Sequence, residues 1–167
     1  MTEQLVILGV DPGTCITGYG VIRYSALSQE ALDFGCIVPP KKWALSQRYL
    51  VIFDALTQLI ERHRPQAVAI ETQFVAKNPQ VAIKLGMARG MALLAATKKE
   101  VPVFGYSPRK IKQAVVGTGG ASKQQVQKMM QILLSLPRLP EPEDAADALA
   151  LAMCHGHASR IQQAERL

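Results

Sequence analysis

The chain has 167 residues, with 19 Lys or Arg against 13 Asp or Glu and a formal net charge of +6 at pH 7. This length suits one domain with a full hydrophobic core, so we expect residues 1–167 to form a single domain. The sequence contains no apolar run of ~18 residues and no charged N-terminal stretch leading into an apolar one. These features argue against a membrane span, a secretory signal and a membrane partner, and they favour a cytoplasmic location.

The positive charge is concentrated in the middle of the chain. Residues 72–140 contain eleven Lys or Arg and one acid, Glu100, whereas seven acids lie in residues 1–71 and five in residues 141–167. A basic region flanked by clustered acids is typical of a polyanion-binding face around an acidic pocket. Charge alone does not separate this interpretation from an ordinary solvated surface.

The sequence elements predict an α/β fold. Apolar and β-branched runs predict strands at 5–10, 18–25, 31–38, 66–70 and 101–106. Apolar spacing, capping residues and prolines predict helices at 45–60, 79–99, 108–116, 123–136 and from about residue 143 onward. Asn78 and Ser122 are the expected N-caps, the latter in a capping box with Gln125. The order predicts one mixed five-stranded sheet flanked by helices, without an internal repeat.

Two carboxylates follow predicted strands at their C-terminal ends. Asp11 ends the first strand and opens the turn Asp-Pro-Gly-Thr, and Glu71 ends the fourth. Ligand sites of open α/β sheets lie at such strand ends. Asp11 is equally explained as a residue that caps the turn through its side chain.

Two further carboxylates, Asp144 and Asp147, lie three residues apart in the last predicted helix, so both can face one spot. The intervening and following alanines would let this helix approach the sheet closely. The helix macrodipole by itself also favours acids at this end.

Four carboxylates brought together at one end of a sheet would repel one another and raise each other's pKa. Hard divalent cations relieve such repulsion, so we expect two Mg²⁺ ions, with Mn²⁺ as a substitute. A two-metal site of this kind suits phosphodiester hydrolysis.

Five sets of short motifs run in order over roughly residues 5 to 157. They are Asp11-Pro-Gly-Thr with Thr17-Gly-Tyr-Gly20, Ile70-Glu71-x-x-Phe74 with Ala76-Lys-Asn78, Lys84-Leu-Gly-x-Ala-Arg-Gly90, Val115-Val-Gly-x-Gly119, and Asp144-Ala-Ala-Asp-Ala-Leu-Ala150. On these motifs the sequence resembles the RuvC family of Holliday-junction resolvases, which have an RNase H-like (retroviral integrase superfamily) fold.

The resemblance implies roles for named residues. The implied catalytic and metal-binding acids are Asp11, Glu71, Asp144 and Asp147. Phe74 corresponds to the aromatic residue that stacks at the junction centre, and Lys112 and Lys123 to basic residues near the scissile phosphate. Further candidates for DNA contacts are Lys77, Lys84 and Arg89. The family acts as a homodimer that nicks two opposed strands of a four-way junction in recombination and repair, together with RuvA and RuvB.

Three alternatives stay open at this point. A sugar kinase or actin-like ATPase has a similar strand-and-turn motif, but it needs two such subdomains. A related RNase H-like nuclease acting on RNA or RNA–DNA hybrid would show turnover on hybrids. A catalytically silent DNA-binding module would tolerate loss of the four acids.

The remaining chemistry-bearing residues are given structural roles. His155 and His157 are expected to act as cations at the C-terminal end of the last helix. Their spacing with Cys154 does not match a standard zinc site. The three cysteines, Cys15, Cys36 and Cys154, are odd in number and far apart, which argues against a disulfide framework.

Overall fold

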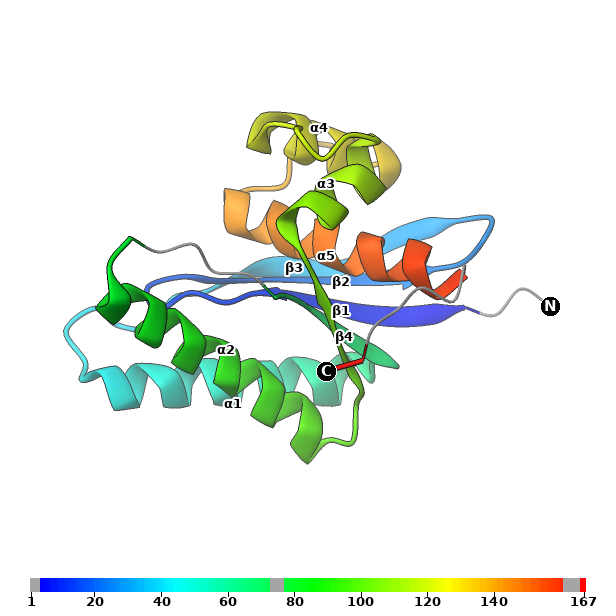
Figure 1. Ribbon diagram of the computed structural model, residues 1–167. Helices are drawn as coiled ribbons and strands as arrows, with labels where there is room; N and C mark the ends of the chain where they lie inside the picture. The colour runs from blue at the N-terminus through cyan, green and yellow to red at the C-terminus, as the bar shows by residue number, and fades with distance from the viewer. Residues whose placement is uncertain (1–3, 73–76, 161–165) are drawn as a thin grey trace.

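The computed structural model describes residues 4–72, 77–160 and 166–167. Five strands form one mixed sheet with the order β3-β2-β1-β4-β5 (Figure 1). The strands are β1 (Leu5–Asp11), β2 (Thr17–Tyr24), β3 (Gln29–Ile37), β4 (Ala67–Glu71) and β5 (Val103–Tyr106). The first three form an antiparallel meander, whereas β4 pairs parallel with β1 and β5 pairs parallel with β4.

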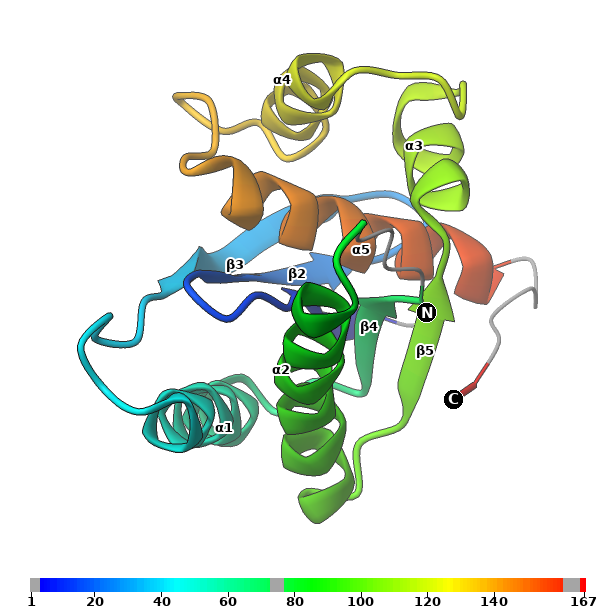
Figure 2. The same ribbon diagram turned by 60° about the vertical axis from the view of Figure 1, so that its left-hand side comes forward.

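Helices cover both faces of the sheet. They are α1 (Leu45–His63), α2 (Pro79–Lys98), α3 (Pro108–Val116), α4 (Lys123–Leu133) and α5 (Glu143–Arg160). One face carries α5 with α3 and α4 stacked on it, and the other face carries α1 and α2 (Figures 1 and 2). The predicted mixed five-stranded sheet flanked by helices is therefore confirmed. None of the helices in the described ranges is apolar over a length that would cross a membrane.

The helix ends follow the predicted caps. The side chain of Asn78 accepts a hydrogen bond from the Gln80 amide at 2.9 Å, and Ser122 accepts one from the Gln125 amide at 3.2 Å. Gln125 Oε1 in turn accepts from the Ser122 amide at 2.8 Å, which confirms the predicted capping box.

One predicted helix is shorter than its apolar pattern suggests. The prediction of a helix over 123–136 is wrong at its C-terminal end, because α4 ends at Leu133. Ser135 has a φ of 50°, in the left-handed region, so the chain leaves the helix there. The amide of Leu136 then donates to the Gln131 carbonyl at 2.9 Å and closes this end.

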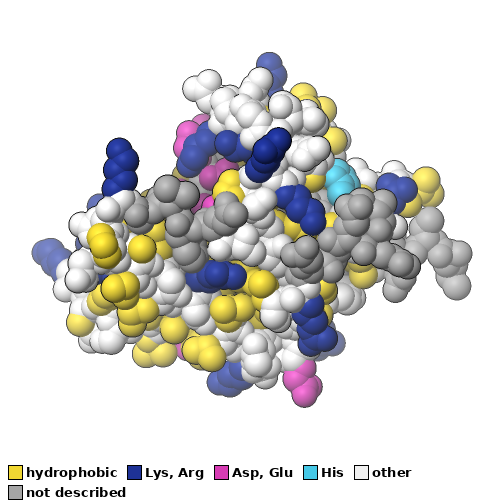
Figure 3. Space-filling view, viewed as in Figure 1, with side chains coloured by type: hydrophobic (Ala, Val, Ile, Leu, Met, Phe, Trp, Pro, Cys, Tyr) yellow, Lys and Arg dark blue, Asp and Glu magenta, His cyan; other side chains and the backbone are white. Residues whose placement is uncertain are grey.

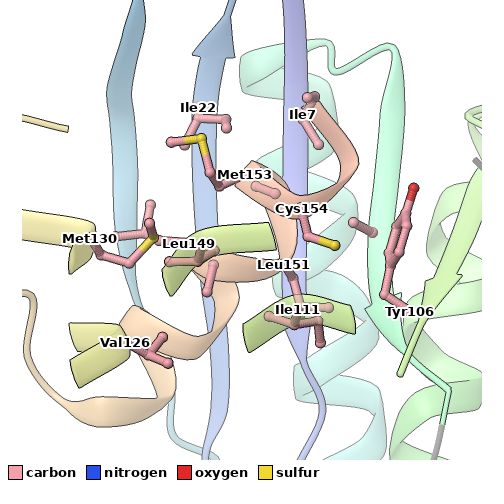
Figure 4. Close-up of a cluster of buried hydrophobic side chains, with 14 of the residues drawn as sticks. Ile7, Ile22, Tyr106, Ile111, Val126, Met130, Leu149, Leu151, Met153 and Cys154 are labelled. Atoms are coloured by element: carbon pink, nitrogen blue, oxygen red, sulfur yellow. The ribbon is translucent and has the colours of Figure 1, made fainter. Parts of the chain in front are cut away.

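Successive side chains along each strand point to opposite faces of the sheet, and each face has its own hydrophobic core. On the α5 side, Ile7 and Ile22 pack with Leu149, Leu151 and Met153, all fully buried (Figure 4). The core on the α1 and α2 side is likewise built from hydrophobic residues, and its members from the central strands and α1 include Leu8, Val10, Val21, Ile52, Leu56, Val68 and Ile70.

The α5 helix lies unusually close to the sheet. A Cβ atom built at Gly9 would collide with the Ala148 carbonyl oxygen, and one at Gly20 would lie 2.7 Å from the Leu149 amide nitrogen. Gly9 and Gly20 are register partners on β1 and β2, so together they form a bare strip beneath the helix. The predicted close approach of the alanine-rich helix is confirmed, and it requires glycine on the strands.

Candidate active site

The carboxylates of Asp11 and Glu71 project from neighbouring parallel strands. Val10 pairs with Ile70 in the β1–β4 register, so the two acids that follow them end at the same edge of the sheet. This arrangement is the one that the strand-end positions in the sequence predict.

Gly18 brings the helix acids to the same edge. It pairs with Asp11 across the β1–β2 register, and a Cβ atom at Gly18 would collide with the Asp144 carbonyl oxygen. The first turn of α5 therefore lies directly over the end of β1. Asp147 is three residues further along, on the same side of the helix.

The turn that follows Asp11 is closed by another side chain. Thr17 Oγ1 donates to the Gly13 carbonyl at 2.8 Å and accepts from the Gly13 amide at 3.2 Å. Arg48 of α1 donates to the Thr14 carbonyl and fixes the outer part of the turn. These bonds hold the turn, and the Asp11 side chain faces a cavity instead.

This cavity has a volume of about 290 Å³. Three of the predicted acids, Asp11, Glu71 and Asp147, line it together with Lys112 and Lys123. The rest of its lining consists of apolar side chains from α3, α4 and α5, namely Pro108, Ile111, Val126 and Leu151. Acidic and basic side chains lie side by side beneath the upper helices in the space-filling view (Figure 3).

The carboxylates interact strongly with one another. Burial, followed by the charges of Asp147, Glu71 and Asp144, raises the pKa of Asp11 to about 7. Burial and the charge of Asp147 also raise the pKa of Glu71. Asp144 does not line the cavity, but its effect on the pKa of Asp11 places its charge within electrostatic range.

Lys123 partly compensates this negative charge. Its Nζ lies 3.6 Å from Asp147 Oδ2 and 3.8 Å from Glu143 Oε2. Asp147 first, and then Glu143 and Asp11, raise the pKa of the Lys123 ammonium. Glu143 was missed by the sequence reasoning, although its place one residue before Asp144 in the first turn of α5 was the available signal.

The donor set has the right chemistry for hard divalent cations, but it is not assembled as a ligand shell. Over residues 4–72, 77–160 and 166–167, no three His, Cys, Asp or Glu side chains converge closely enough to hold one ion as they stand. Burial is the largest cause of the raised pKa values of Asp11 and Glu71, and the charge of Asp147 adds to it. Carboxylate oxygens are the ligands that Mg²⁺ and Mn²⁺ prefer, so the chemistry of these residues fits either ion.

Comparison with known proteins identifies the family. The family model described as "Crossover junction endodeoxyribonuclease RuvC" matches residues 7–155. A curated protein of that name from Protochlamydia amoebophila is 55% identical over 165 residues, covering 99% of this chain and 98% of its own. One from Marinobacter nauticus is 53% identical over 152 residues, covering 91% of this chain and 86% of its own.

The chain belongs to the RuvC family.

Solved structures agree with this assignment. A Thermus thermophilus RuvC in complex with a Holliday junction substrate has a TM-score of 0.93 at 35% identity, covering 98% of this chain and 99% of its own. A yeast mitochondrial Holliday junction resolvase has a TM-score of 0.65 at 16% identity, covering 94% of this chain and 81% of its own, and shows the shared fold alone. The predicted RNase H-like fold is confirmed by these neighbours.

The other basic residues predicted from the RuvC resemblance lie in α2 and just before it. Lys77 is exposed and precedes the N-cap of α2, Lys84 is exposed in the first half of the helix, and Arg89 is partly buried in its middle. None of these three is among the described residues that line the acidic cavity. Phe74 lies outside the described residues.

The expectation that His155 is a cation is wrong. His155 is 3% exposed, its Nδ1 lies 2.6 Å from the Tyr106 hydroxyl, and its ring stacks on Phe104. Burial lowers the pKa of His155 to about 4, so the ring is neutral at neutral pH. Burial also lowers the pKa of His157, whose Nδ1 lies 3.0 Å from the Ala114 carbonyl oxygen. All-round burial of α5 explains the error.

Proposed function

We propose that this chain is a structure-selective endodeoxyribonuclease that resolves Holliday junctions by nicking two opposed strands symmetrically, in recombination and repair. Its support is the full-length similarity to proteins named crossover junction endodeoxyribonuclease, and to a Thermus RuvC bound to a Holliday junction substrate. The observation that carries the proposal is structural. Carboxylates from two strand ends and one helix meet two lysines in a single cavity.

In the proposed site, Asp11, Glu71, Asp144 and Asp147 hold two Mg²⁺ ions, for which Mn²⁺ can substitute. When bound, these ions supply an activated water and charge stabilisation for the leaving oxygen. Asp11 has to be ionised to act as a ligand, so its raised pKa makes it the most proton-sensitive of the group.

The remaining residues of the cavity position the DNA strand. Lys112 of α3 and Lys123 of α4 line the same cavity as the acids, where their ammonium groups can bind the oxygens of the scissile phosphate. The apolar side chains of Ile111, Val126 and Leu151 form the remaining walls around these charged groups.

Contacts with the rest of the junction are assigned to α2 and the segment before it. The charges of Lys77, Lys84 and Arg89 suit binding of backbone phosphates. We assign Phe74, on the family resemblance, to stacking on bases at the junction centre, where one stacked base contributes ~1–3 kcal/mol. A homodimer suits this substrate, because two nicks related by a two-fold axis match two related sites. RuvA and RuvB are the proposed partners, and the cytoplasm is the proposed location.

The proposed function is tested with an end-labelled synthetic four-way junction, resolved on a denaturing gel after incubation with Mg²⁺. We expect paired symmetric nicks from the wild type and junction binding without cutting from Asp11→Asn. The matched control is Asp54→Asn, which removes an exposed Asp on α1 and should cut at the wild-type rate.

Two other outcomes would overturn the assignment. Junction binding with equal inactivity of wild type and Asp11→Asn would indicate a silent DNA-binding module. Cutting of RNA–DNA hybrid or linear duplex as fast as the junction would retain a nuclease site but contradict a resolvase.

A further inference from the structure

Lys123 is held between two carboxylates that belong to the same face of α5. Glu143 and Asp147 are four residues apart, so their side chains are neighbours on the helix surface. The Lys123 ammonium lies 3.8 Å from Glu143 and 3.6 Å from Asp147 and spans the two. Asp147 lines the acidic cavity, whereas Glu143 is more exposed and lies outside its lining.

The backbone places Lys123 there. It is the first residue of α4, directly after the N-cap Ser122, and the capping box with Gln125 fixes this turn. The start of α4 therefore faces the start of α5, and the long Lys side chain bridges the two helices. Its position follows from the packing of α4 against α5.

Lys123 supplies a positive charge beside the clustered acids. Asp11, Glu71 and Asp147 share one small cavity, and the charge of Lys123 lowers the pKa of each of them. An ammonium beside Asp147 opposes the approach of a divalent cation to the same carboxylate, because like charges repel.

We propose that Lys123 is the built-in counter-cation of the metal-free site and that Glu143 is a positioning residue to which Lys123 withdraws when divalent cations bind the acids. This inference rests on the proposed metal-dependent function. Lys123 competes with the metal for Asp147, and Glu143 weakens that competition by stabilising the withdrawn position. The withdrawn ammonium stays at the rim of the cavity, where it meets the incoming phosphate.

The test is a calorimetric titration of the DNA-free, full-length protein with Mn²⁺ at about pH 8, where most of Asp11 is ionised. Lys123→Gln removes the competitor and should tighten Mn²⁺ binding about fivefold. Glu143→Gln removes the carboxylate that would hold the withdrawn Lys123 and should weaken Mn²⁺ binding about threefold. In the Lys123→Gln background, Glu143→Gln should change the affinity by less than about 1.5-fold, because the two residues act through each other.

Glu141→Gln is the matched control, since it removes a nearby exposed acid that forms no ion pair with Lys123 among the described residues. It should leave the Mn²⁺ affinity unchanged, and thermal unfolding without Mn²⁺ should show that every variant is folded. A Glu143→Gln effect that persists in the Lys123→Gln background, or that Glu141→Gln reproduces, would show a general charge effect and overturn the proposal.

Failure of this proposal is distinguishable from failure of the proposed function. Mn²⁺ binding that Lys123→Gln weakens or leaves unchanged would overturn the role of Lys123 and leave the metal-dependent nuclease intact. If the wild type binds no Mn²⁺ at all, both are overturned.

Discussion

The two helical layers pack against the sheet in different ways. On one face, α5 rests on the bare backbone of Gly9 and Gly20, where its alanines allow close approach, although larger side chains such as Leu151 and Met153 also contribute to this core. On the other face, Leu8 and Val10 meet Ile52 and Leu56 of α1 through full-sized side chains. Close approach occurs on the face that carries the acids, so the tight packing there serves the site as well as stability.

The two ends of α5 also differ in their electrostatics. At its start, carboxylates remain close together and Lys123 supplies the opposing charge. Near its end, His155 is buried beside Tyr106 and stays neutral. One helix therefore contributes a proton-sensitive acid site at one end and an uncharged packing contact at the other.

The largest expected effect comes from filling the strip beneath α5. Gly9→Ala would drive a Cβ atom into the backbone at Ala148, so α5 has to move away from β1. We expect the free energy of unfolding to fall by at least about 3 kcal/mol, with loss of junction cutting. Urea unfolding at neutral pH measures this, and a variant of wild-type stability would contradict the close packing.

A large pH-dependent effect is expected at Asp11. The pKa of its carboxyl is 3.8 in the reference state and about 7 in the folded protein, so the native state holds the proton over this range while the unfolded chain has lost it. Stability is therefore lost as the pH rises from about 4 to about 7. Asp11→Asn removes this loss and should be more stable than the wild type by about 2–4 kcal/mol above pH 7 without metal.

Urea unfolding across this pH range checks the Asp11 prediction. The difference between wild type and Asp11→Asn should shrink toward zero near about pH 4. A difference that does not depend on pH would show that Asp11 is not under electrostatic strain.

The effect of His155 has the opposite sign. Its folded pKa of about 4 lies below the ordinary value of 6.5, so the unfolded chain binds more protons between these values. Stability should fall by about 2–3 kcal/mol as the pH drops through this window. The double variant His155→Leu/Tyr106→Phe removes both hydrogen-bonding partners, and its free energy of unfolding in urea should vary less with pH in this window. A pH dependence equal to that of the wild type would contradict a buried neutral His155.

The smallest expected effect lies in the other layer. A Cβ atom at Gly86 of α2 would have no other atom within 4 Å, in contrast to Gly9. Gly86→Ala should stabilise the protein by about 0.5–1 kcal/mol through helix propensity alone. Thermal unfolding measures it, and destabilisation would contradict the open space around Gly86.

Much of this architecture could be predicted from local patterns. Asp11 and Glu71 were predictable because each ends an apolar strand, and the spacing of Asp144 and Asp147 was predictable from helical periodicity. Local patterns also located the caps of α2 and α4. These features depend on residues close together in the sequence, where propensity and periodicity act.

The missed features depend on contacts between distant segments. Glycines in β1 and β2 became meaningful only once the register placed Gly9 and Gly20 beneath the same helix. The neutral state of His155 follows from burial between α5 and β5, and the Lys123–Glu143 contact follows from how α4 meets α5. The DNA-binding roles of Phe74, Lys77, Lys84 and Arg89, and the single-domain organisation, stay predictions.

The most direct test of the account is anomalous diffraction from crystals of the full-length protein grown with Mn²⁺. We expect two Mn²⁺ peaks bounded by Asp11, Glu71, Asp144 and Asp147, with Lys123 moved from Asp147 toward Glu143. Saturating Mn²⁺ without a peak among these four carboxylates, or with the metal bound elsewhere, would contradict the claim that the close approach of α5 to the sheet builds a metal-dependent nuclease site.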